Sequence, residues 1–152
     1  MKWTKKDMTQ YMEAKEYIDT IVIPLLPFQI AKDKESTKYA SQGEVLLLLT
    51  NELERELSGR MMLIPNYSYL TSTDKSEEID RINAFVNNIQ EQPFSHIFFL
   101  TFDSGWKKFE QSLQGNLLWI PSVPSEDLYS SATHAMVKDQ VSQVSELIRS
   151  YW

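Results

Sequence analysis

Short apolar segments alternate along the chain with longer amphipathic ones, and three of the short segments end at the same dipeptide. IVIP occupies residues 21–24, MLIP residues 62–65 and LWIP residues 118–121. Their length and their β-branched residues favour strands over helices. Because proline lacks the N–H that a strand ladder requires, we predict that each Ile-Pro marks the point where a strand leaves the sheet. A fourth segment, HIFFLTF, is nearly continuous in apolar residues and predicts a strand buried on both faces. The four predicted strands cover residues 18–23, 60–65, 96–102 and 116–121.

The segments around these strands place apolar residues at helical spacing. We predict helices over residues 4–16, from Ser36 or Ser41 to a stop at Gly59, from Thr73 or Asp74 to Pro93, over residues 103–114, and from the end of SVPSED to Tyr151. QIAKDKESTK at residues 29–38 has no such periodicity and is predicted as a charged loop. The alternative for residues 103–114 is a hairpin that joins antiparallel third and fourth strands.

Strand and helix alternate four times, which predicts one α/β domain over residues 1–152. We expect a three-layer sandwich in which helices cover both faces of a mostly parallel four-stranded sheet, with right-handed crossovers. The carboxyl ends of all strands then meet at one edge, where open α/β sheets bind ligands. This edge is the first place to look for a functional site.

Polar residues follow three of the predicted strands, and five of them are candidate ligand-binding residues. Asp103 and Ser104 follow the third strand, Asn66 and Ser68 follow the second, and Ser122 follows the fourth. Asp103 could act as a general base or a metal ligand, but an N-cap of the next helix is the interpretation that we favour. Asn66 and Ser68 fit a small-molecule pocket, but a structural turn is the interpretation that we favour.

The remaining composition argues against several classes of site. The chain has no cysteine, and its two histidines have no partner at ligand spacing. Its four glycines are too dispersed for a phosphate-binding loop. We therefore predict no catalytic residue, no metal site and no cofactor. The formal net charge of -6 disfavours nucleic acid as a partner. The polar N-terminal segment and the lack of a long apolar run predict a cytoplasmic protein without membrane insertion.

The motifs MKWTKKDM, IVIPLLPF, IPNYSYL, FFLTFDSGW and LLWIPSVP occur in this order along the whole chain. Together they resemble the YpiF-like family of uncharacterised proteins from Bacillus and its relatives. That family is a domain of unknown function without assigned catalytic residues, so the resemblance implies no activity.

The first functional hypothesis is a non-enzymatic interaction module with a protein partner, or a homodimer through the C-terminal helix. That helix ends in Tyr151 and Trp152, and aromatic residues concentrate in interfaces. The alternative is a small-molecule-binding protein or an enzyme that uses the carboxyl edge of the sheet.

Overall fold

The computed structural model describes residues 1–122 and 127–152, and within them the chain folds around one parallel sheet. The strands are β1 (Thr20–Phe28), β2 (Met61–Leu63), β3 (Tyr67–Leu70), β4 (His96–Thr101) and β5 (Asn116–Trp119). They are arranged in the order β2-β1-β4-β5, and β3 pairs with the carboxyl-terminal half of β1. Every ladder among these strands is parallel, which confirms the predicted α/β class.

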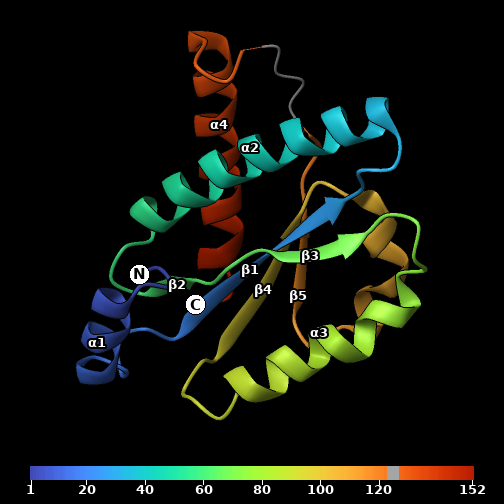
Figure 1. The fold of residues 1–152 in the computed structure, drawn as a ribbon. Helices are drawn as coiled ribbons and strands as arrows, with labels where there is room; N and C mark the ends of the chain where they lie inside the picture. Colours follow the sequence, from blue (N-terminus) through green and yellow to red (C-terminus); the bar gives the residue numbers. More distant parts are fainter. Residues whose placement is uncertain (123–126) are drawn as a thin grey trace.

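Helices cover both faces of this sheet (Figure 1). They are α1 (Lys5–Glu13), α2 (Asp33–Glu56), α3 (Ser76–Ile89), the 3₁₀-helix η1 (Ser104–Ser112) and α4 (Ser131–Arg149). The core on one face packs α2 and α4 against Val22, Phe98 and Leu100. The core on the other face packs α1, α3 and η1 against Ile21 and Phe99. Adjacent residues of β1 and β4 thus point into different cores, as the pleat of a strand requires.

The prediction that every Ile-Pro ends a strand is wrong for Pro24. Strand β1 continues through Pro24 and Pro27 to Phe28, and Pro24 lies opposite Leu100 of β4. The Ile64 N–H donates to the Val22 carbonyl oxygen, so the even-numbered backbone groups of β1 face β2 and β3. The nitrogen of Pro24, which carries no hydrogen, therefore faces residues 64–66, where no strand is formed. The ladder loses no hydrogen bond, and β1 can contain a proline although it is an interior strand.

The structure also corrects two other element predictions and decides between the two alternatives for residues 103–114. Residues 67–70, which were expected in a loop, form β3, so the sheet of the described residues has five strands instead of four. Helix α2 begins at Asp33, inside the segment predicted as a charged loop. Residues 104–112 are helical and β5 runs parallel to β4, which rules out the hairpin alternative. The predicted helix stop is confirmed by Gly59, whose φ of 91° lies in the left-handed region that favours glycine.

Among the helices that the structure describes, none is both long enough and apolar enough to cross a bilayer.

Candidate functional site

The carboxyl edge of the sheet contains a topological switch between β1 and β4. From β1 the chain passes through α2 to β2 on one side, whereas α3 then carries it to β4 on the other side. Such a switch opens a crevice at the carboxyl ends of the two central strands. Asp103 follows β4 and lies at this position.

The Asp103 carboxylate is held by donors from three different segments. Oδ2 accepts a hydrogen bond from the Tyr69 hydroxyl at 2.8 Å and lies 3.0 Å from the Lys75 ammonium nitrogen. Oδ1 accepts from the Gly105 N–H at 2.9 Å and so caps η1. The Asp103 N–H itself donates to Thr101 Oγ1 at 3.0 Å. These contacts confirm the N-cap interpretation and join the end of β4 to β3 and to the start of α3.

The two acidic groups of this cluster titrate away from neutral pH. Burial by itself would raise the pKa of Asp103, but the Tyr69 hydrogen bond, the Lys75 ammonium group and the Gly105 N–H outweigh it and lower that pKa. Burial and the neighbouring carboxylate both raise the pKa of Tyr69. The cluster is therefore an ionised carboxylate that accepts from a neutral phenol. A carboxylate with a lowered pKa is a weak general base.

Trp106 forms the floor of this cluster and is fully buried. Its ring packs edge-on against Tyr69 at a centroid distance of 5.1 Å and against Phe109 at 6.4 Å. The Lys75 ammonium nitrogen lies 5.8 Å from the centroid of the Trp106 ring. The indole N–H makes no hydrogen bond within the described part of the chain, although it lies close to the Tyr69 hydroxyl. The aromatic packing thus fixes the ring, with its buried N–H beside the Tyr69 hydroxyl.

The five candidate residues predicted from the sequence do not come together at one point. Asp103 and Ser104 are adjacent, and Ser104 is exposed at the start of η1. Ser68 alternates along β3 with the buried Tyr69, so its side chain lies on the opposite face of the sheet from Asp103. Asn66 follows β2 and Ser122 follows β5, which are the two ends of the strand order. Both are exposed, and β1 and β4 separate them.

An apolar groove lies on the α2 face of the same edge and was not predicted from the sequence. Residues 26–30 at the end of β1 and the side of α2 between Ser36 and Leu47 line it, and its volume is about 610 Å³. Three of its lining residues are unusually exposed for their type: Phe28 at 50%, Ile30 at 75% and Leu47 at 54%. Leu70 of β3 lies opposite Phe28 in the ladder and is 48% exposed. The signal in the sequence was the run of apolar residues that continues past Pro27.

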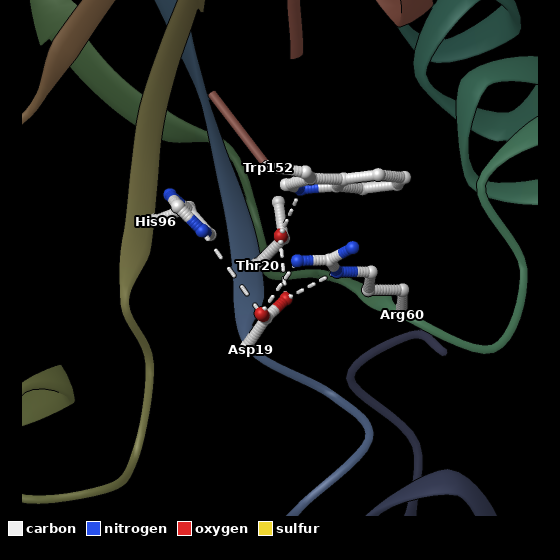
Figure 2. Close-up of polar contacts among 5 residues, drawn as sticks. All are labelled: Asp19, Thr20, Arg60, His96 and Trp152. Atoms are coloured by element: carbon white, nitrogen blue, oxygen red, sulfur yellow. Dashed lines mark hydrogen bonds and ion pairs between the residues drawn. The ribbon is translucent and has the colours of Figure 1, made fainter. Parts of the chain in front are cut away.

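A second polar network lies at the amino edge of the sheet (Figure 2). Arg60 binds both carboxylate oxygens of Asp19, each at 2.9 Å, and its guanidinium carbon lies 4.0 Å from the centre of a Trp152 ring. The Trp152 indole N–H donates to Thr20 Oγ1 at 2.8 Å, and His96 Nε2 lies 4.0 Å from Asp19. The C-terminal residue therefore docks on the body of the same chain. Within the described ranges, no three potential His, Cys, Asp or Glu ligands gather into a metal site.

The family described as "Protein of unknown function (DUF2487)" matches residues 9–152. The chain belongs to this family. It is also 31% identical to the "Uncharacterized protein YpiF" of Bacillus subtilis (strain 168), over 100% of this chain and 98% of that protein. No solved structure matches the chain significantly. The resemblance indicated by the sequence motifs is confirmed.

The amino-edge network of this family member follows from the same rule that located the carboxyl edge. Asp19 and Arg60 directly precede β1 and β2, and His96 is the first residue of β4. Because parallel strands begin at a common edge, polar residues at their starts are brought together. Sequence reasoning that considered only the strand ends missed this cluster.

Stability is expected to fall at acid pH as Asp19 is protonated. Burial alone would raise the pKa of Asp19, but its contacts with Arg60 and Thr20 and the charge of His96 lower it. Its folded pKa is therefore below the unfolded value of about 3.9, so its stabilising contribution is complete above that value and is lost as the pH falls through the folded pKa. Asp19→Asn should cost about 1–2 kcal/mol at neutral pH, and the difference from wild type should shrink below about pH 4.

Urea unfolding of both proteins between neutral pH and the acid limit measures this difference. The control is Glu52→Gln, which removes an exposed ion pair with Arg55 and should have little effect at any pH. A cost of Asp19→Asn that stays constant across the whole range would contradict the prediction.

Proposed function

We propose that the protein is a non-enzymatic, cytoplasmic interaction module that binds a protein partner through the apolar groove and the adjoining β3 edge. The exposure of Phe28, Ile30, Leu47 and Leu70 on one continuous surface carries this proposal. Single exposed apolar residues are common, but contiguous apolar patches on a protein surface mark interaction sites. A second groove, between α2 and α4, mixes apolar residues with the charged side chains of Glu52, Arg55, Glu56 and Lys138, so it offers no continuous apolar surface.

The chemistry of the carboxyl edge supports an interaction role over catalysis. Both Asp103 oxygens already accept from protein donors, and the pKa of this carboxyl is lowered. Ser104 is exposed beside it at the start of η1. The sheet separates Ser68 from Asp103. This arrangement contains no activated nucleophile and no acid–base pair of the kind that hydrolytic enzymes use.

A small-molecule-binding protein is the second candidate. Its support is the size of the groove, about 610 Å³, which falls within the range of ligand pockets. The mostly apolar lining would select an apolar ligand, and the five polar candidates from the sequence would then lie outside or at the border of its site. We favour the protein partner because the apolar surface extends beyond the groove to Leu70.

Site-specific photo-crosslinking tests the proposal. A benzophenone amino acid placed at Phe28 should form a covalent adduct with a discrete protein in cells that naturally produce this chain. The adduct should disappear when Ile30→Asp introduces a charge into the groove. The matched control carries the same probe at Tyr17, which is 65% exposed near the amino edge and should give no such adduct.

Two outcomes would count against a protein partner. Equal adducts at Phe28 and Tyr17 would show that crosslinking is unspecific. No protein adduct at Phe28, together with an apolar small molecule that remains bound in native mass spectrometry, would establish the second candidate instead.

A further inference from the structure

We propose that the partner is a second copy of this chain, which pairs its β3 edge antiparallel with the β3 edge of the first copy about a twofold axis. This inference rests on the proposed function, because it names the occupant of the same surface. It follows from three properties of β3: an open backbone edge, a lack of protecting residues, and an adjoining apolar area of suitable size.

The outer edge of β3 has no partner strand among the described residues. Thr71 donates its N–H to the Phe28 carbonyl oxygen at 3.1 Å, so alternate backbone groups of this segment face β1. The N–H groups of Ser68 and Leu70 consequently face away from the sheet. They make no hydrogen bond within residues 1–122 and 127–152. Outward-facing groups of this kind form a template for another strand.

The other half of the same sheet edge is covered by the chain itself. Lys2 forms a parallel bridge with Leu63 of β2, and the Leu63 N–H donates to the Met1 carbonyl oxygen at 2.8 Å. The N-terminal amine anchors this segment through Glu54 at 2.7 Å. The chain thus adds an extended segment to β2 and leaves the β3 half open.

Strand β3 also lacks the residues that usually protect an open edge. Natural edge strands are commonly guarded by lysine, proline or a bulge. The sequence of β3 is Tyr-Ser-Tyr-Leu, which contains neither a charge nor a proline. The buried Tyr67 and Tyr69 hold the strand on the body while Ser68 and Leu70 remain accessible.

A twofold axis at Tyr69 satisfies the open groups of both copies at once. In that register Ser68 of one copy lies opposite Leu70 of the other, and each such pair exchanges its N–H···O bonds. The Leu70 carbonyl oxygen already accepts from the Thr73 N–H at 3.3 Å, and its second lone pair is free for the new bond. The same short segment serves both sides, which is the defining property of an isologous dimer.

The apolar area beside β3 matches what such a dimer requires. Phe28, Ile30, Leu47 and Leu70 together expose on the order of 450 Å² if each full side chain offers about 200 Å². A standard interface buries about 800 Å² per partner, and slightly more than half of it is apolar. The exposed side chains therefore account for the apolar share of one standard interface.

Sedimentation equilibrium of the full chain over a wide range of concentrations tests the dimer. Wild type should dimerise, and Leu70→Asp should raise the dissociation constant by more than about tenfold. The matched control is Leu147→Asp, because Leu147 is equally exposed at 48% but lies on α4, where the sequence predicted the dimer contact. This control should dimerise like wild type. Circular dichroism must show that both variants remain folded.

Hydrogen exchange distinguishes strand pairing from unspecific apolar association. The amides of Ser68 and Leu70 should become protected as the protein concentration rises and should exchange rapidly on dilution. Free exchange of both amides in the dimer, or a dimer disrupted by Leu147→Asp and not by Leu70→Asp, would overturn the inference. A monomer at every concentration whose Phe28 probe still crosslinks to a different protein would refute the second copy and leave the proposed function intact.

Discussion

Replacement of Asp103 by alanine should lower the free energy of unfolding by about 3 kcal/mol, well above the roughly 1 kcal/mol typical of a lost helix cap. The additional cost arises because the carboxylate does more than cap η1. It accepts from the Tyr69 hydroxyl at 2.8 Å and pairs with Lys75 at 3.0 Å. Alanine would leave the phenol without its acceptor and the ammonium group without its counter-charge.

Two variants separate the cap from the rest of the cluster. Asp74→Ala removes an exposed hydrogen bond to the Ser76 N–H at the start of α3 and no buried contact, so it should cost clearly less than Asp103→Ala. Adding Lys75→Met to Asp103→Ala should recover part of the lost stability, since no unpaired cation then remains. Chemical denaturation monitored by circular dichroism provides the values. If Asp103→Ala cost no more than Asp74→Ala, the carboxylate would be a simple cap.

The Asp103 cluster has a consequence for the proposed interface. Tyr69 belongs to β3, and its bond to Asp103 ties this short edge strand to the end of β4. Because β3 has only four residues, its position depends on such side-chain anchors as much as on its ladder with β1. The polar cluster on one face of the sheet therefore holds β3 in place. The outer edge and the opposite face of the same strand form the proposed interface.

Truncation of Trp106 to alanine should destabilise the protein by about 4 kcal/mol, the usual cost of removing a large buried aromatic side chain. Trp106 is 0% exposed and contacts Tyr69 and Phe109 through its ring. The short 3₁₀-helix that contains it has no other fully buried residue, so its attachment depends mainly on this side chain. The cavity left behind cannot close without moving η1 or β3.

The prediction for Trp106 has two matched comparisons. Trp3→Ala removes the same side chain from a position that is 62% exposed and should change stability by less than about 0.5 kcal/mol. Trp106→Phe keeps a ring but removes the unpaired indole N–H, so it should cost much less than the alanine variant. A loss below about 1 kcal/mol for Trp106→Ala would show that η1 is held by other contacts.

Much of the fold could be predicted because it depends on short-range patterns. The alternation of apolar strands and amphipathic helices determined the α/β class and the common direction of the strands. Local backbone chemistry located the helix ends at Thr4, Asp103 and Gly59. Each of these signals acts over a few residues, so it can be interpreted without knowledge of the rest of the chain.

The errors came from features that depend on what lies beside a segment. Proline in general disfavours an interior strand, and Pro24 is tolerated only because its missing donor faces the gap between β2 and β3. The Asn66 and Ser68 content of the segment after Pro65 favours a turn, yet pairing with β1 makes residues 67–70 a strand. A local sequence pattern cannot show that Pro24 is tolerated or that residues 67–70 pair with β1, because both facts depend on the order of the strands in the sheet.

The sequence by itself determined most of the helices and strands, the parallel direction of the strands, and the presence of polar residues at their ends. Only the tertiary structure decided which of these groups meet. Asp19 pairs with Arg60 across 41 positions, and Trp152 reaches Thr20 across 132. Such contacts depend on strand order, register and the face on which each side chain emerges. A shift of one residue along a strand reverses that face, so the partners are defined only once the whole sheet is assembled.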